Sequence, residues 1–187
     1  MSSNGRLRAE LTATWAPAGG SAPATLSVPA NDAGGLPFER RHVVRSHEVG
    51  PDGGVRPVVV LQWFEDAVFR SAARAGWDRT RMAAADFIAL VIGHHLVLGL
   101  PAHEGDELTV TSRLFEARRV SGSWRHEVRR SDGGLVAADH DRGAFVDATG
   151  RLRLAPDGLI HDLLRGDPDE HLQGGDTAPG PDPPATT

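Results

Sequence analysis

The chain has 187 residues, a formal net charge of −5 and no cysteine. The absence of cysteine excludes disulfides, a thiolate nucleophile and cysteine metal ligands. Residues 156–187 carry seven carboxylates and a single arginine, so the rest of the chain is close to neutral, which is not typical of a nucleic-acid-binding protein. No apolar run reaches 18 residues and no signal-peptide pattern is present, so we expect a cytoplasmic protein with no membrane contact.

Composition divides the chain into three parts. Residues 1–36 are rich in Ala, Gly, Ser and Pro, and residues 161–187 are acidic and rich in Pro and Gly. Such segments bury too little apolar surface to offset the entropy lost on ordering. We therefore expect a flexible N-terminal extension, a folded domain at 37–160 and a disordered tail. Alternation within Leu7–Trp15 allows one additional edge strand.

The folded part begins with a strand and a long helix. Residues 38–49 are predicted to form a strand that ends in a glycine-rich turn at 50–54. From Pro57 onward, apolar residues recur every three or four positions, which predicts a helix with one buried face. Proline fits a first helical turn and Gly76 a helix end, so the helix is predicted at 57–76.

Mostly strands follow this helix. The predicted elements are a short turn capped by Asp78 or Thr80, strands at 87–98, 106–117, 121–130 and 135–147, and a short helix at 159–164. Strand, helix and antiparallel meander make an α+β domain of about five strands. One helix covers only one sheet face, so we expect a homodimer or homotetramer.

Three segments, in this order, carry a resemblance to a known family. They are Val55–Ala67, ending LQWFEDA, then Ala102–Val110, AHEGDELTV, and Ala144–Arg151, AFVDATGR. Together they resemble the hot-dog family of acyl-CoA and acyl-carrier thioesterases, in particular the 4-hydroxybenzoyl-CoA thioesterase branch. The resemblance implies a long helix wrapped by an antiparallel sheet. It also implies cofactor-free hydrolysis of a thioester carried by coenzyme A or an acyl carrier protein.

The family's catalytic acid is missing. An ungapped match on Val55 and Glu65 places its usual aspartate on Gly50 and its usual histidine on Gly54. The line from His42 to Trp63 is similar to the enediyne-polyketide thioesterases, which also lack this aspartate. That likeness implies a role in polyketide or other secondary metabolism. A hot-dog protein that has lost hydrolysis, acting as a ligand-binding module or as a dehydratase or cyclase, is the alternative.

The start of the helix is the candidate oxyanion site. Free N–H groups and the positive end of the helix dipole make the amides of Gly54, Val55 and Arg56 candidate donors to a thioester oxygen. The alternative interpretation is a plain tight turn. Candidate general bases are Glu65, Asp52 and Glu48, and the sequence leaves the choice open, with Glu65 slightly favoured.

The remaining candidates concern substrate binding. The predicted substrate-binding residues are Arg56, Trp63, His95, Arg118 and Arg119, with Arg129 and Arg130 added to the phosphate-binding arginine cluster. His94 and His95 point to opposite faces of a strand, so no metal site is expected. The alternative for one of them is a core histidine, and for the arginines a solvated hairpin end. Asp139, His140 and Asp141 are interpreted as solvated.

Overall fold

The computed structural model describes residues 10–15 and 34–165. Residues 1–9, 16–33 and 166–187, which include most of the two predicted flexible ends, lie outside the described residues. The strands are β1 Glu10–Trp15, β2 Phe38–Val43, β3 Ile88–Leu98, β4 Glu107–Arg118, β5 Ser121–Arg130 and β6 Leu135–Val146. The helices are a 3-10 turn η1 at Ser46–Glu48, α1 Pro57–Arg74, α2 Arg79–Ala84 and α3 Leu159–Arg165.

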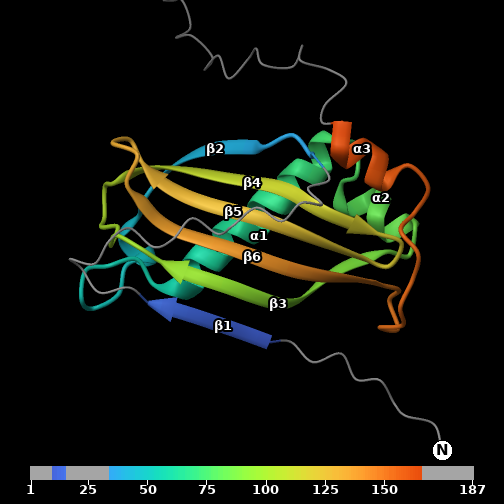
Figure 1. Ribbon diagram of the computed structural model, residues 1–187, viewed down its shortest axis with the longest axis horizontal. Helices are drawn as coiled ribbons and strands as arrows, with labels where there is room; N and C mark the ends of the chain where they lie inside the picture. The colour runs from blue at the N-terminus through green and yellow to red at the C-terminus, as the bar shows by residue number, and fades with distance from the viewer. Residues whose placement is uncertain (1–9, 16–33, 166–187) are drawn as a thin grey trace, which may run out of the picture.

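A single six-stranded sheet with the order β1-β3-β6-β5-β4-β2 crosses the molecule, and α1 lies against one of its faces (Figure 1). All neighbouring pairs from β3 to β2 are antiparallel, which confirms the predicted α+β arrangement of five strands and one long helix. The sixth strand, β1, pairs in parallel with the edge of β3. It falls within the predicted additional edge strand at Leu7–Trp15.

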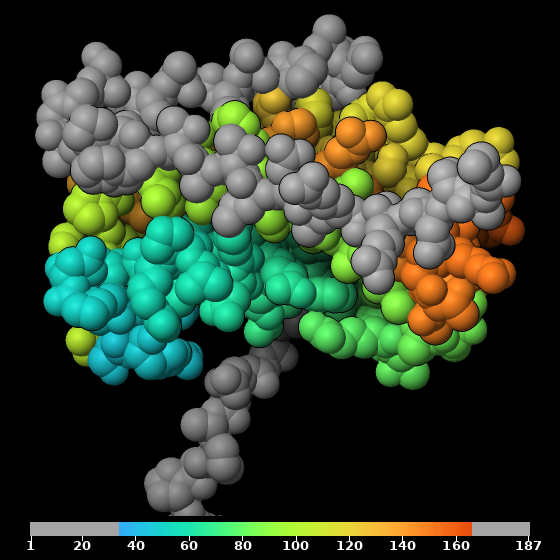
Figure 2. Space-filling model, turned by 90° about the horizontal axis from the view of Figure 1, so that it is seen from below, coloured from blue at the N-terminus to red at the C-terminus, as the bar shows by residue number. Residues whose placement is uncertain are grey.

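Helix α1 matches its predicted position to within two residues. Pro57 occupies the first helical position, and Gly76, with φ +79°, follows the end of the helix. The buried side chains of α1 recur with the predicted three- and four-residue spacing and pack against β2 and β4; they include Val59, Val60, Trp63, Phe64 and Ala67. The space-filling view shows α1 across one face of the molecule (Figure 2). The turn that precedes α1 lies on one side of it, and α2 and α3 lie on the other side.

The predicted strand at 38–49 is only half correct. β2 ends at Val43 and the chain then forms the 3-10 turn η1. The reason is Glu48, whose carboxylate turns inward and accepts a hydrogen bond from the Arg45 N–H at 2.7 Å. This local bond closes a turn and competes with continued strand pairing.

A second, smaller core closes the end of the molecule that holds α2 and α3. Its members include Trp77, Phe87, Phe145 and Leu159. Asp78 caps α2 as predicted, because its carboxylate accepts the Arg81 N–H at 2.8 Å. Helix α3 crosses the boundary predicted at residue 160. None of the described helices is long and apolar enough to span a membrane.

Candidate functional site

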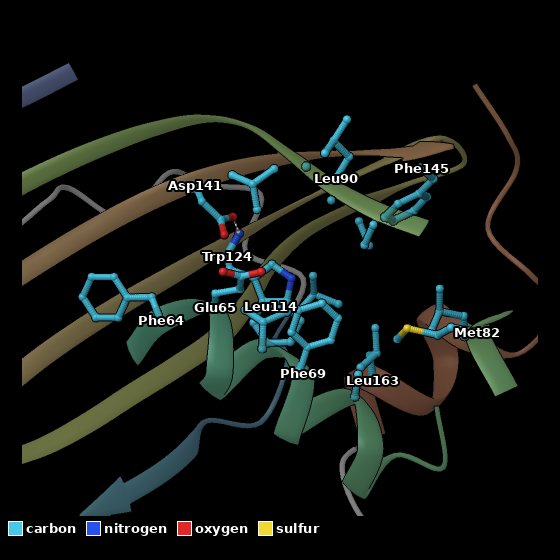
Figure 3. Close-up of a pocket in the computed structure, with 18 of the residues that line it drawn as sticks. Phe64, Glu65, Phe69, Met82, Leu90, Leu114, Trp124, Asp141, Phe145 and Leu163 are labelled. Carbon is cyan, nitrogen blue, oxygen red and sulfur yellow. Dashed lines mark hydrogen bonds between the residues drawn. The ribbon is translucent and has the colours of Figure 1, made fainter. Parts of the chain in front are cut away.

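A cavity of about 420 Å³ lies between α1, the facing side of the sheet, and α3 (Figure 3). Most of its lining is apolar, and towards α3 it is formed by Phe69, Met82, Phe87, Phe145, Leu159 and Leu163. Near the start of α1 the lining consists of Val58, Leu61 and Gln62. Between these two ends lie three ionisable side chains, Glu65, His94 and Asp141. An apolar pocket with a few convergent polar groups is the usual form of a small-molecule site.

Glu65 reaches into the cavity from α1. Figure 3 shows its carboxylate directed towards the sheet, on the side of Trp124 and Asp141. The side chain is exposed and forms no hydrogen bond or ion pair with another described residue. Its oxygens are therefore available to a ligand or a water molecule. The helix position that the sequence favoured for a general base does line a cavity.

His94 projects from β3 into the same cavity. Its Nδ1 is 2.7 Å from Oδ2 of Asp139, a fully buried residue of β6. The hydrogen bond to Asp139 raises the pKa of His94, and the charges of Asp139, Asp141 and Glu65 raise it further, which together outweigh the lowering effect of burial. Nε2 makes no hydrogen bond within the described part of the chain. Asp139 thus fixes which nitrogen faces the cavity.

His95, a predicted substrate-binding residue, lines a separate polar hollow together with Arg118 and does not line this cavity. Residues His94 and Asp141 are paired across β3 and β6, and so are His95 and His140. Neighbouring residues of a strand alternate between faces, so His95 and His140 lie on the face of the sheet away from α1. His94, the residue before His95 in β3, lines the cavity.

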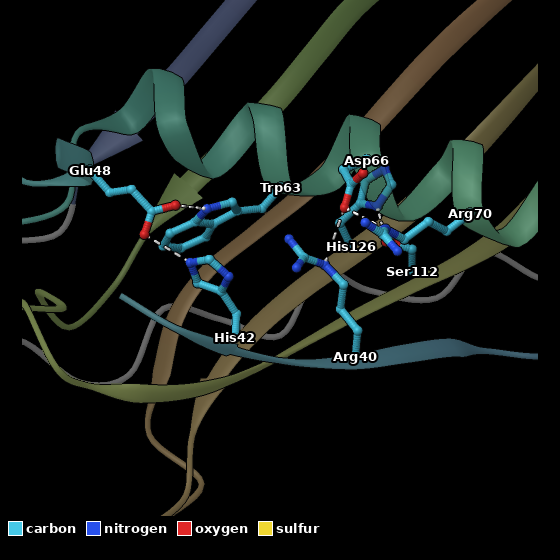
Figure 4. Close-up of polar contacts among 8 residues, drawn as sticks. All are labelled: Arg40, His42, Glu48, Trp63, Asp66, Arg70, Ser112 and His126. Carbon is cyan, nitrogen blue, oxygen red and sulfur yellow. Dashed lines mark hydrogen bonds and ion pairs between the residues drawn. The ribbon is translucent and has the colours of Figure 1, made fainter. Parts of the chain in front are cut away.

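A buried chain of polar residues crosses the sheet beneath α1. Ser112 Oγ lies 2.8 Å from His126 Nδ1, and His126 Nε2 lies 3.2 Å from Asp141 Oδ2. Asp141 Oδ1 also accepts the Trp124 N–H at 2.9 Å, so both of its oxygens are engaged. Ser112 and His126, drawn in Figure 4, are at most 1% exposed. The ring of Phe64 stacks on the imidazole with 4.7 Å between the ring centroids. The enclosed hydroxyl cannot meet a substrate, so this is no serine nucleophile.

The interpretation of Asp139 and Asp141 as solvated is wrong. Both are buried, with 0% and 4% of their surface exposed. The alternation of residues along the strand could have indicated this burial. Asp139 and Asp141 occupy the same face of β6 as the buried residues Ala137 and Phe145. Carboxylates on an otherwise buried strand face require partners, and here His94 and His126 supply them.

The amides predicted as oxyanion donors are already engaged. The N–H of Gly54 donates to Asp52 Oδ1 at 3.2 Å, that of Val55 to Ala102 O at 2.9 Å, and that of Arg56 to Glu48 O at 3.2 Å. None of these residues lines the cavity. In this conformation the turn is closed by its own hydrogen bonds.

The carboxylate of Asp52 lies beside Gly50, the position to which the resemblance assigns the family's acid. A Cβ added to Gly50 would lie 2.9 Å from Asp52 Oδ1. Asp52 does not line the cavity.

Glu48 and Trp63 belong to the core instead of the substrate site. Glu48 accepts hydrogen bonds from Trp63 Nε1 and His42 Nε2, both at 2.9 Å (Figure 4). Burial raises the pKa of Glu48, but the three hydrogen bonds from Arg45, Trp63 and His42 outweigh it and leave the pKa below its usual value. Arg56 holds the same turn through the carbonyls of His47 and Glu48.

The predicted arginine cluster does not form. In the β4–β5 hairpin Arg118 pairs with Ser121, whereas Arg130 pairs with Leu108 at the opposite end, roughly 30 Å away at strand spacing. Arg118 is exposed, pairs with Glu116 at 2.6 Å, and lines a second, polar hollow of about 490 Å³ together with Arg142. His94 and Asp141 line both hollows.

Comparisons with known proteins bear on this geometry. The family model of the thioesterase-like superfamily matches residues 44–181. The fold is similar to that of a 1,4-dihydroxy-2-naphthoyl-CoA thioesterase from Synechocystis, with 16% identity, TM-score 0.63 and coverage of 68% of this chain and 96% of the other. A hypothetical protein from Staphylococcus aureus solved in complex with CoA gives 16% identity, TM-score 0.65 and coverage of 78% and 97%.

A hypothetical protein from Thermus thermophilus is similar at 26% identity, with TM-score 0.62 and coverage of 67% of this chain and 96% of the other. Among curated proteins, none matches the sequence significantly.

Proposed function

The chain belongs to the thioesterase-like superfamily, and we propose that it hydrolyses an acyl thioester of coenzyme A or of an acyl carrier protein. The observation that carries the proposal is the apolar cavity with Glu65 and His94 at its middle. Hydrolysis of a thioester needs an apolar site for the acyl group, a base for water and a donor for the carbonyl oxygen.

The shape of the cavity supports one orientation of the substrate. The acyl group occupies the aromatic part near Phe87 and Phe145, and the thioester lies beside Glu65. The pantetheine arm leaves past His94, towards the polar hollow that Arg118 lines. This orientation places the reacting carbon between α1 and β3.

Glu65 is the proposed general base, supported by its position in the cavity and its free carboxylate. Asp52 is the alternative, supported by its place beside Gly50, the position to which the resemblance assigns the family's acid. Arg118 and Arg119 are proposed to bind phosphates of the carrier, and the support for Arg118 is its position in the polar hollow. A neighbouring fold solved with CoA is consistent with this substrate class.

A second copy of the chain is proposed to cover the cavity rim. Val58 and Leu90 line the cavity, yet they are 54% and 42% exposed, and Ile88 on the same strand is 46% exposed. Exposed large apolar side chains of this kind are typical of a protein interface. We expect a homodimer or homotetramer, acting in polyketide or other secondary metabolism.

Purified protein tested against acyl-CoA and acyl-carrier thioesters of graded length, with free thiol as the readout, tests the proposal. We expect turnover to rise with apolar acyl groups that fill the cavity. No thiol release from any member of the panel would contradict it.

The occupied amides of Gly54, Val55 and Arg56 favour one other candidate, a hot-dog protein that binds a ligand or acts as a dehydratase or cyclase without hydrolysis. Thermal stabilisation by a non-hydrolysable acyl-CoA thioether, with no thiol release from the matching thioester, would support this candidate.

A further inference from the structure

The proposed hydrolysis lacks one component, a donor for the oxyanion. The helix-start amides at residues 54–56 are engaged elsewhere. We propose that the imidazolium of His94, held by Asp139, is the oxyanion donor of this site. The inference rests on the proposed function and adds a residue to it.

The geometry places His94 where such a donor is needed. It lines the same cavity as Glu65, and the two approach from opposite walls, β3 and α1. Because Nδ1 is bound to Asp139 at 2.7 Å, the other nitrogen is left without a partner among the described residues. A thioester between the two walls then has a base on one side and an N–H on the other.

Asp139 accounts for the charge on His94. Its carboxylate is fully buried, and its Oδ1 accepts no hydrogen bond from the described residues. A buried, ionised carboxylate with so few hydrogen-bond donors is stabilised by an adjacent positive charge. The groups that face His94 are Asp139 and Asp141 from β6 and Glu65 from α1, and all three raise its pKa. These contacts favour the protonated form of the ring, in which Nε2 carries a hydrogen.

The other polar groups of the site are less suited to the role. His126 is enclosed under Phe64 and both of its nitrogens have partners. Asp141 is an acceptor with both oxygens engaged. Among the described residues that line the cavity, His94 is the cationic side chain.

The reaction balances with these two groups. Glu65 takes a proton from water as the water oxygen bonds to the carbonyl carbon, and the carbonyl electron pair becomes an oxyanion that accepts the hydrogen bond from His94 Nε2. The oxyanion then re-forms the C=O bond and expels the thiolate. The thiolate takes the proton held by Glu65, which gives a carboxylic acid and a thiol.

His94→Leu tests the donor, with His103→Leu as the control because the exposed His103 lines neither hollow. The loss of one oxyanion donor costs about 10²–10³ in kcat with KM little changed. His94→Gln, which keeps a neutral N–H donor, should recover part of the lost kcat. His103→Leu should retain the wild-type kcat. A His94→Leu variant with the wild-type kcat would overturn the inference.

The pH profile separates a donor from a base. A donor must be protonated, so kcat falls as pH rises through the pKa of His94; a base would give the opposite limb. Asp139→Asn removes the main cause of the raised pKa, so it should move this alkaline limb to lower pH, a shift that a purely structural role would not produce. Should Asp139→Asn fail to fold, NMR titration of the wild-type imidazoles provides the test, with His94 identified by its absence in His94→Gln.

The failure of this inference is distinguishable from the failure of the proposed function. No turnover by the wild-type protein overturns both. If the wild-type protein is active, two results overturn the donor role alone. One is a His94→Leu variant with the wild-type kcat, and the other is a wild-type kcat that increases as pH rises through the pKa of His94. An NMR pKa of His94 below its ordinary value also overturns it.

Discussion

The start and the middle of α1 are the two places at which the sequence offers catalytic groups, and the structure treats them differently. At the start, the amides of residues 54–56 donate to Asp52, Ala102 and Glu48. At the middle, Glu65 faces a cavity with its carboxylate unpaired among the described residues, opposite His94.

This difference shows under which condition the N-terminus of a helix can bind a ligand. Unsatisfied N–H groups and the helix dipole make it one only where the preceding turn leaves those groups free. Here the turn at 50–54 closes on itself through Gly50 N–H to Gly54 O at 2.8 Å and Gly53 N–H to Gly50 O at 3.0 Å. Its role is to fix the direction in which α1 begins.

The largest expected effect comes from the middle of the helix. Glu65→Gln removes the proposed base while keeping the shape of the side chain, so we expect kcat to fall by about 10²–10⁴ with little change in stability. Asp52→Asn, at the helix start, should leave kcat close to the wild-type value, because Asp52 does not line the cavity. Steady-state kinetics of the two variants measure the contrast. A large loss in Asp52→Asn with activity retained in Glu65→Gln would reverse the assignment.

The helix and the meander were predictable because each depends on local periodicity or turn chemistry, whereas Glu65 was a candidate through the family resemblance. The polar chain beneath α1 was not predictable from the sequence. Ser112, His126 and Asp141 are up to 29 residues apart in sequence, and only the register of β4, β5 and β6 brings them together. The choice between His94 and His95 was equally hidden, because a strand presents adjacent residues to both faces and the sequence does not say which face meets the helix.

A second prediction concerns the stability of the helix start. Glu48→Gln keeps the volume but weakens the hydrogen bonds from Arg45, Trp63 and His42, so we expect unfolding free energy to fall by about 1–3 kcal/mol. Because the pKa of Glu48 is lower in the folded state, its contribution is present above the unfolded pKa and is lost as pH falls through the folded pKa.

Urea unfolding of wild type and Glu48→Gln between about pH 3 and 7 measures this contribution. The free-energy difference between them should shrink at the acid end. A difference that is constant with pH would contradict the assignment of a charged Glu48.

A third prediction separates the buried polar chain from the chemistry. Ser112→Ala leaves His126 Nδ1 without its partner in a fully buried position, so we expect a loss of about 1–2 kcal/mol in unfolding free energy. The kcat should stay at the wild-type value under conditions where the protein is folded, since the hydroxyl is enclosed. Unfolding and kinetics on the same preparation provide the test, with Ser123→Ala as the control for a buried serine of β5. A kcat that fell with Ser112 alone would place the serine in the reaction.

The smallest expected effect lies outside the cavity, at the hairpin between β4 and β5. Arg118 and Arg129 are matched: each is exposed and pairs with a glutamate two residues before it, Glu116 at 2.6 Å and Glu127 at 2.8 Å. Of these two arginines, only Arg118 lines the polar hollow beside His94.

If Arg118 binds a carrier phosphate, Arg118→Ala should raise KM for acyl-CoA about two- to fivefold, the size expected of an exposed ion pair, and leave kcat unchanged. Salt screens such a contact, so the difference should disappear at high ionic strength. Arg129→Ala should leave KM at the wild-type value, and equal effects of the two substitutions would show that only net charge is sensed.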